Sequence, residues 1–70
     1  IDSKTKLQEF SLKKFKSLPI YKLVSSSGPK HKPNFIISVK LKDTKIFKGS
    51  GNSKKKAEQV AAKNLLDSIK

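Results

Sequence analysis

The stretch Gly49-Ser50-Gly51-Asn52-Ser53-Lys54-Lys55-Lys56-Ala57 joins a loop of small residues to the start of a predicted helix, with three lysines in the first helical turn. That turn presents unpaired N–H groups and a partial positive charge, so acidic residues are favoured there and lysines are mildly unfavourable. A phosphate accepts hydrogen bonds from such N–H groups and pairs with ammonium groups. We therefore expect this stretch to bind an anion.

The segment after this stretch predicts an amphipathic helix with Ser53 as its N-cap, running to about Ile69. Its apolar positions recur with the helical period: Ala57, Ala61, Ala62, Leu65, Leu66 and Ile69. Because the alanines come first, we expect the start of the helix to lie close against a sheet while the leucines fill a wider gap.

The segment before this stretch predicts three strands. Residues 35–42 alternate apolar and polar side chains, which is typical of a strand with one buried face. Residues 20–24 predict a shorter strand with Tyr21 and Leu23 on one side, and residues 46–48 a third after a hairpin turn around Asp43. Turn residues predict a loop over residues 25–33.

An N-terminal helix precedes the strands. Asp2, Ser3 and Thr5 offer N-cap chemistry, and an amphipathic segment follows to about residue 15, with Leu7 and Phe10 on one face. Pro19 ends the helical region. The order α-β-β-β-α predicts an α+β fold, in which a three-stranded antiparallel sheet carries both helices on one face and residues 1–70 form one domain.

Size and composition restrict the function classes. Seventy residues without cysteine allow one small domain with no disulfide, no thiolate metal site and no deep catalytic cleft. No apolar run is long enough to span a membrane. Because the chain begins with Ile1 and contains no methionine, we expect it to be a piece of a longer protein.

The charge predicts a polyanionic partner, because 17 basic residues face 5 acidic ones and the formal net charge is +12. Every basic residue is lysine, which suits phosphate better than the planar contacts by which arginine recognises guanine. A lysine-rich proteome would also raise lysine at the expense of arginine, without any function.

Two further segments are candidates for a binding surface. Thr5, Gln8 and Glu9 share a face of the first helix, where Glu9 would be repelled by phosphate but would accept a hydrogen bond from a ribose 2′-hydroxyl. The alternative is a Glu9–Lys13 surface pair, with Gln8 closing a capping box on Thr5. His31 lies in a proline-bounded loop that would enter a groove; otherwise it is simply solvated.

Together these pieces resemble the double-stranded RNA-binding domain. The residues that carry the resemblance are Leu7-Gln8-Glu9, Pro19, Tyr21, Gly28-Pro29-x-His31, Phe35, Gly49-x-Gly51-x-Ser53-Lys54-Lys55-x-Ala57, Ala61-Ala62, Leu65 and Leu66. They span the whole chain, so the resemblance is specific.

The resemblance implies three contacts with double-stranded RNA over about 16 base pairs. Thr5, Gln8 and Glu9 would touch one minor groove, and the loop with Pro29 and His31 would touch the next. The phosphates across the intervening major groove would be bound by Ser53, Lys54 and Lys55, with Lys56 as a partial substitute for a frequent family lysine whose place Glu58 takes. Asn52 also replaces a frequent lysine, so we expect weaker binding at this end.

The opening Asp2-x-Lys4-Thr5-x-Leu7-Gln8-Glu9 most resembles the C-terminal domain of bacterial ribonuclease III. This implies a cytoplasmic, homodimeric parent that cleaves double-stranded RNA in rRNA and mRNA processing, with Mg²⁺ held by a separate nuclease domain. For the chain itself we expect a monomer without catalytic residues, cofactor, metal, membrane contact or small-molecule substrate.

Three alternatives stay open. The domain could belong to another RNA-processing protein. Some members of this fold have lost RNA binding and act as protein-interaction modules. A net charge of +12 would also suffice for a general binder of polyanions or anionic membranes.

Overall fold

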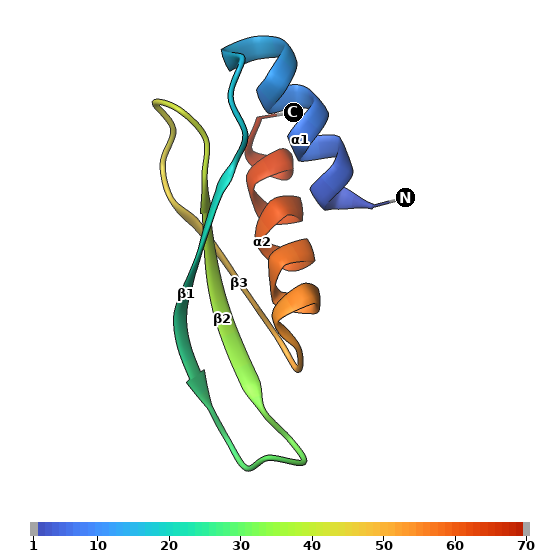
Figure 1. Cartoon of the computed structure of the whole chain (residues 1–70), viewed down its shortest axis with the longest axis vertical. Coiled ribbons are helices and arrows are strands. Elements are labelled where there is room, and N and C mark those ends of the chain that lie inside the picture. Colours follow the sequence, from blue (N-terminus) through green and yellow to red (C-terminus); the bar gives the residue numbers. More distant parts are fainter. Residues whose placement is uncertain (1, 70) are drawn as a thin grey trace.

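A computed structural model describes residues 2–69 of the chain. The elements follow the predicted order: α1 (Ser3–Phe15), β1 (Ile20–Ser27), β2 (Asn34–Lys40), β3 (Phe47–Gly51) and α2 (Lys54–Ser68). The strands form one antiparallel sheet in the order β1-β2-β3, and both helices lie on one face of it (Figure 1). The predicted α+β fold is confirmed.

Local chemistry explains where the helices begin and end. The Asp2 carboxylate caps α1 by accepting hydrogen bonds from the backbone N–H groups of Lys4 and Thr5 at 2.9 and 3.4 Å. Lys16 ends this helix in the left-handed region (φ 59°), where its N–H donates to the Leu12 carbonyl. Ser53 caps α2, as predicted, by accepting from the Lys56 N–H at 3.1 Å.

The core lies between the sheet and the helices. It consists of Leu7 from α1, Val39 and Leu41 from β2 and its end, and Ala61, Ala62 and Leu65 from α2. Register explains the contribution of the sheet, because Tyr21 faces Val39 across β1 and β2 while Phe47 faces Val39 across β2 and β3. One buried polar group was not predicted: the Ser11 hydroxyl donates to the Ser17 carbonyl at 2.6 Å and ties the end of α1 to the chain that follows.

Several predicted boundaries are wrong. β1 continues to Ser27, past the predicted end at residue 24, because residues 25–27 pair with residues 34–36 beyond a bulge. β3 begins at Phe47, one residue late, and continues to Gly51, so Gly49–Gly51 is strand where a loop was predicted. Ile69 follows the end of α2 and is 42% exposed, so the helix ends one residue before the predicted end.

The glycines of β3 allow α2 to lie against the strand. A Cβ atom on Gly49 would lie 2.2 Å from the Ala61 nitrogen and 2.6 Å from the Ala57 oxygen, and one on Gly51 would lie 2.9 Å from the Ala57 nitrogen. These neighbours are backbone atoms, so no side-chain rotation relieves the overlap. The predicted close approach of the alanine-rich start of α2 to the sheet is therefore confirmed, and glycine is its counterpart on the strand.

We expect Gly49→Ala to lower the free energy of unfolding by about 3 kcal/mol, because the added methyl group pushes α2 away from β3. Urea unfolding followed by circular dichroism measures the loss. The matched control is Ser50→Ala, on the adjacent exposed position of the same strand, which should change stability by less than about 0.5 kcal/mol. Equal unfolding midpoints for the two variants would contradict the proposed backbone contact.

Candidate nucleic-acid interface

The three predicted contact regions follow one another along the longest dimension of the molecule, which measures 40 Å. Figure 1 shows α1 near one end, the N-terminus of α2 further along, and the β1–β2 loop at the opposite end. The lysine-rich turn therefore lies between the other two regions. This order matches the one that the resemblance implies for two minor grooves and the major groove between them.

The N-terminus of α2 offers N–H donors that have no acceptor among the described residues. The N–H groups of Lys56 and Ala57 are bound by the Ser53 hydroxyl and carbonyl at 3.1 and 3.0 Å. Among residues 2–69, nothing accepts from the N–H groups of Lys54 and Lys55, and the first turn of α2 has no acidic residue. The three lysine side chains are exposed, so two N–H groups and three ammonium groups are available to an anion.

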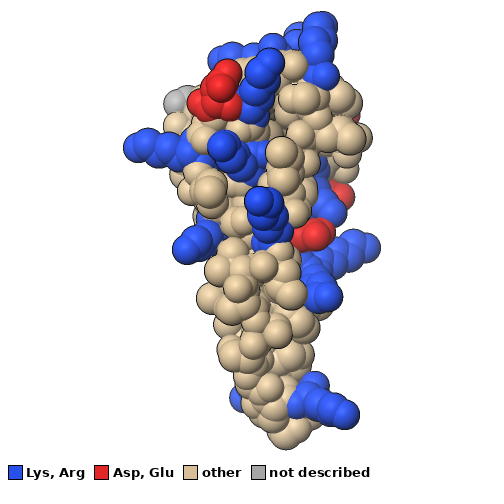
Figure 2. Space-filling model, turned by 60° about the vertical axis from the view of Figure 1, so that its left-hand side comes forward, with Lys and Arg blue, Asp and Glu red and all other residues tan. Residues whose placement is uncertain are grey.

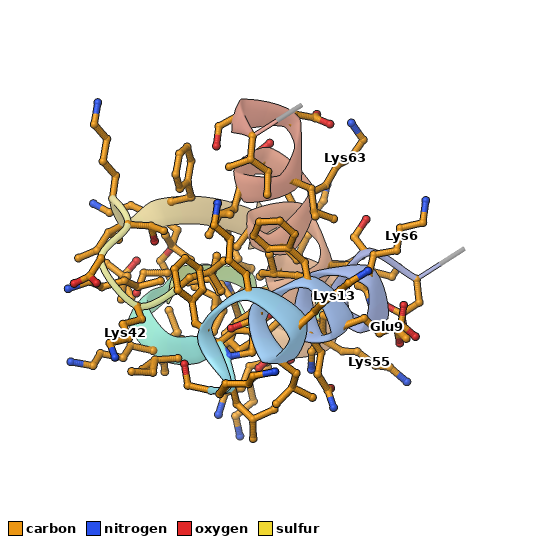
Figure 3. All side chains as sticks on the ribbon, turned by 90° about the horizontal axis from the view of Figure 1, so that it is seen from above. Lys6, Glu9, Lys13, Lys42, Lys55 and Lys63 are labelled. Atoms are coloured by element: carbon orange, nitrogen blue, oxygen red, sulfur yellow. The ribbon has the colours of Figure 1, made fainter. Side chains whose placement is uncertain are left out.

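The face of α1 with Thr5, Gln8 and Glu9 is exposed. Thr5 lies inside the helix and is not its cap, because Asp2 holds that position, so the capping box considered for Gln8 is absent. The ion pairs among residues 2–69 join Lys4 to Glu58 and Lys63 to Asp67, so Glu9 is not paired with Lys13 either. In Figure 3, Glu9 and Lys55 project toward the same side of the molecule, away from Lys42.

The β1–β2 loop is held by its own backbone. The Lys32 N–H donates to the Pro29 carbonyl at 2.9 Å, which closes a turn with Lys30 and His31 at its exposed corner. Gly28 precedes this turn at φ +86°, and a Cβ there would lie 2.6 Å from the Lys32 oxygen. The loop therefore holds a hydrogen-bonded turn at its tip, and its entry into a groove stays a prediction.

A polar cluster that sequence reasoning missed joins α1 to α2. The Lys4 ammonium contacts the Glu58 carboxylate at 2.7 Å and lies 5.2 Å from the centre of the Tyr21 ring. The Gln59 side chain accepts from the Lys4 backbone N–H at 3.2 Å and donates to the Asp2 carboxylate. These five residues, Asp2, Lys4, Tyr21, Glu58 and Gln59, form what we call the interhelical cluster.

The environment of the cluster shifts the pKa values of Asp2 and Tyr21. The hydrogen bond from Gln59, together with those from the Thr5 and Lys4 backbone, holds the pKa of the Asp2 carboxyl below its ordinary value. Burial raises the pKa of the Tyr21 phenol to about 12, and the negative charges of Glu58 and Asp2 add to this effect. The Tyr21 hydroxyl is buried without a hydrogen-bond partner among the described residues.

The remaining lysines are spread over the molecule. Figure 2 shows lysines over the upper and middle parts of one face, then a stretch almost free of charge, then lysine at the lower tip. Some of them have other partners: Lys14 lies over the rings of Phe10 and Phe15, and Lys63 pairs with Asp67 at 2.8 Å. The net charge therefore overstates the charge available at any one contact.

The described part of the chain lacks both a metal-binding cluster and a membrane-spanning helix. Residues 2–69 contain no group of three or more His, Cys, Asp or Glu side chains placed to hold a metal ion. None of the helices described is long and apolar enough to cross a bilayer.

Known proteins resemble this chain in sequence. A family model described as "Double-stranded RNA binding motif" matches residues 3–69. The chain is 64% identical over 69 residues to a Ribonuclease 3 from Pelagibacter ubique (strain HTCC1062) and 52% identical over 69 residues to one from Leptospira interrogans. Each alignment covers 99% of this chain but only 31% and 28% of those relatives, so the chain spans less than a third of their length.

Solved structures resemble it as well. The solution structure of both dsRBDs of DRB4 with their linker has a TM-score of 0.71 at 40% identity, covering 94% of this chain and 42% of that one. The solution structure of the DRB4 dsRBD2 has a TM-score of 0.67 at 38% identity, covering 99% and 96%. Since the family model spans residues 3–69 and the fold agrees, the chain belongs to the double-stranded RNA binding motif family.

Proposed function

We propose that this chain binds double-stranded RNA by its A-form shape, with little dependence on sequence. The observation that carries the proposal is the position of the α2 N-terminus, where unpartnered N–H groups and three exposed lysines lie between the α1 face and the β1–β2 loop. Family membership supports the same partner. A single anion site would serve any phosphate, but three regions in a row favour an extended duplex.

Each region has a distinct chemical task in this proposal. Lys54 and Lys55 pair with phosphates on both sides of the major groove while their N–H groups donate to phosphate oxygens. Gln8 and Glu9 approach the shallow minor groove, where Glu9 accepts from a 2′-hydroxyl and Gln8 both donates and accepts. The turn with Pro29 and His31 reaches the next minor groove as a preformed element, so little conformational entropy is lost on binding.

We further propose that the chain is the RNA-binding part of a ribonuclease III that processes rRNA and mRNA in the cytoplasm. The Ribonuclease 3 relatives, which are 64% and 52% identical, support this parentage. Any Mg²⁺-dependent cleavage by the parent would be carried out by a separate nuclease domain.

The proposal is tested by titrating the chain with an RNA duplex of about 20 base pairs and with the DNA duplex of the same sequence, at several salt concentrations. We expect tighter binding to RNA, because only RNA offers 2′-hydroxyls and A-form grooves. The logarithm of the binding constant should fall linearly with the logarithm of salt. Equal affinity for RNA, DNA and anionic vesicles would instead indicate a general polyanion binder.

Replacing either central lysine should weaken binding uniformly across RNA sequences. We expect Lys54→Ala or Lys55→Ala to lower the salt slope by about 1, because one phosphate contact disappears. Lys42→Ala removes the same charge on the opposite side of the molecule and serves as the control (Figure 3). If the double variant of Lys54 and Lys55 binds as tightly as the control, the phosphate site lies elsewhere.

Changes on α1 should affect the choice of nucleic acid instead. Glu9→Ala is expected to reduce the preference for RNA over DNA by about 1 kcal/mol, since a 2′-hydroxyl loses its acceptor. Glu9→Gln keeps an acceptor oxygen without the charge and should retain most of the preference. Parallel RNA and DNA titrations of both variants provide the measurement. If Glu9→Gln reduces the preference for RNA as much as Glu9→Ala does, Glu9 does not recognise a 2′-hydroxyl.

A further inference from the structure

The interhelical cluster connects the proposed minor-groove contact to the proposed phosphate contact. Lys4 lies in the first turn of α1, one residue before Thr5, and Glu58 lies one turn after Lys54 on α2. Their ion pair at 2.7 Å therefore joins the beginnings of the two binding elements directly. The side chains of Lys4 and Glu58 are only 36% and 25% exposed, so water screens this pair less than a fully exposed one.

Further contacts hold the two partners in place. Gln59 binds both the Lys4 backbone N–H and the Asp2 cap, so the end of α1 is fixed through main chain as well as side chain. Tyr21 connects the sheet to this cluster, because the Lys4 ammonium lies over its ring, 5.2 Å from the ring centre. The start of α1 is thus attached to both α2 and β1 by polar contacts, whereas the middle of the helix is held by the apolar Leu7.

We propose that Lys4 and Glu58 are positioning residues for duplex recognition, which set the separation between the α1 face and the lysines of α2. The inference rests on the proposed function, since it explains how the domain selects an RNA duplex. Two contacts that read groove shape act together only when their spacing matches the duplex. A mobile α1 would still bind phosphates through the lysines but would lose its register with the minor groove.

The contact with Lys4 changes the role that we assign to Glu58. Taken alone, a carboxylate one turn after the phosphate-binding lysines would repel RNA and weaken the site. In the structure its charge is compensated by Lys4, which comes from the other helix. Glu58 therefore contributes an interhelical contact, and Lys4 is held by protein rather than by phosphate.

Binding of matched RNA and DNA duplexes of about 20 base pairs distinguishes this role from a simple charge effect. We expect Glu58→Ala to lower the ratio of RNA to DNA affinity about fivefold, although the variant gains positive charge. Asp67→Ala is the control, because it also removes a carboxylate from α2 together with its ion pair to Lys63. A simple charge effect predicts stronger binding of both duplexes by both variants.

Two further variants separate positioning from stability. Glu58→Gln keeps an acceptor for Lys4 and should restore most of the RNA preference, whereas a charge effect predicts the behaviour of Glu58→Ala. The double variant Lys4→Ala/Glu58→Ala should lose no more RNA preference than either single variant, because both residues act through one contact. Circular dichroism and the fluorescence of Tyr21, the sole tyrosine in a chain without tryptophan, verify that each variant is folded at the temperature used.

The outcomes are distinct. If the unmodified chain prefers RNA and Glu58→Ala keeps or raises that preference, the positioning role is overturned while the proposed function stands. Additive losses for Lys4→Ala and Glu58→Ala would also overturn it, since Lys4 would then be touching the duplex independently. If the unmodified chain shows no preference for RNA over DNA, the proposed function itself fails.

Discussion

The contact between the backbone of β3 and the backbone of α2 is the constraint on which the arrangement depends. Because Gly49 has no Cβ atom, the backbone of α2 at Ala57 and Ala61 can lie directly on the strand. Only Asn52 and Ser53 separate the two elements, which directs the helix N-terminus outward beside the sheet. Small residues at this contact thus determine where the lysine-rich first turn of α2 lies. Larger side chains at these positions would push that turn away from the sheet.

Geometry, more than charge, accounts for the selectivity that we propose. Lysines lie on several sides of the molecule, and some are engaged with aromatic rings or a carboxylate, so the net charge of +12 explains attraction to any polyanion. Discrimination needs groups at fixed separations. The capped start of α2, the turn closed between Pro29 and Lys32 and the clamped start of α1 supply such groups on rigid elements.

Much of the fold was predictable from the sequence, because the core positions and helix ends depend on local periodicity and capping residues. The alternation from Phe35 and the alanine and leucine spacing of α2 identified both layers of the core, and Ser53 was correctly placed as a cap. The ends of the strands were not predictable, because these serines and glycines have little strand propensity of their own and join the sheet only by pairing with β2. Sheet register, not local preference, makes residues 25–27 and Gly49–Gly51 part of strands.

The candidate site was likewise predictable only where a residue acts without a partner distant in sequence. Resemblance identifies the residues of each region one by one, and the structure leaves them exposed except Ser53, which is half-buried and caps α2. Glu58 is different, because its meaning depends on Lys4, which lies 54 residues away in sequence and 2.7 Å away in space. A pattern that compares single positions counts the acidic residue as a lost phosphate contact. In the fold, the carboxylate at this position instead joins α2 to α1 through Lys4.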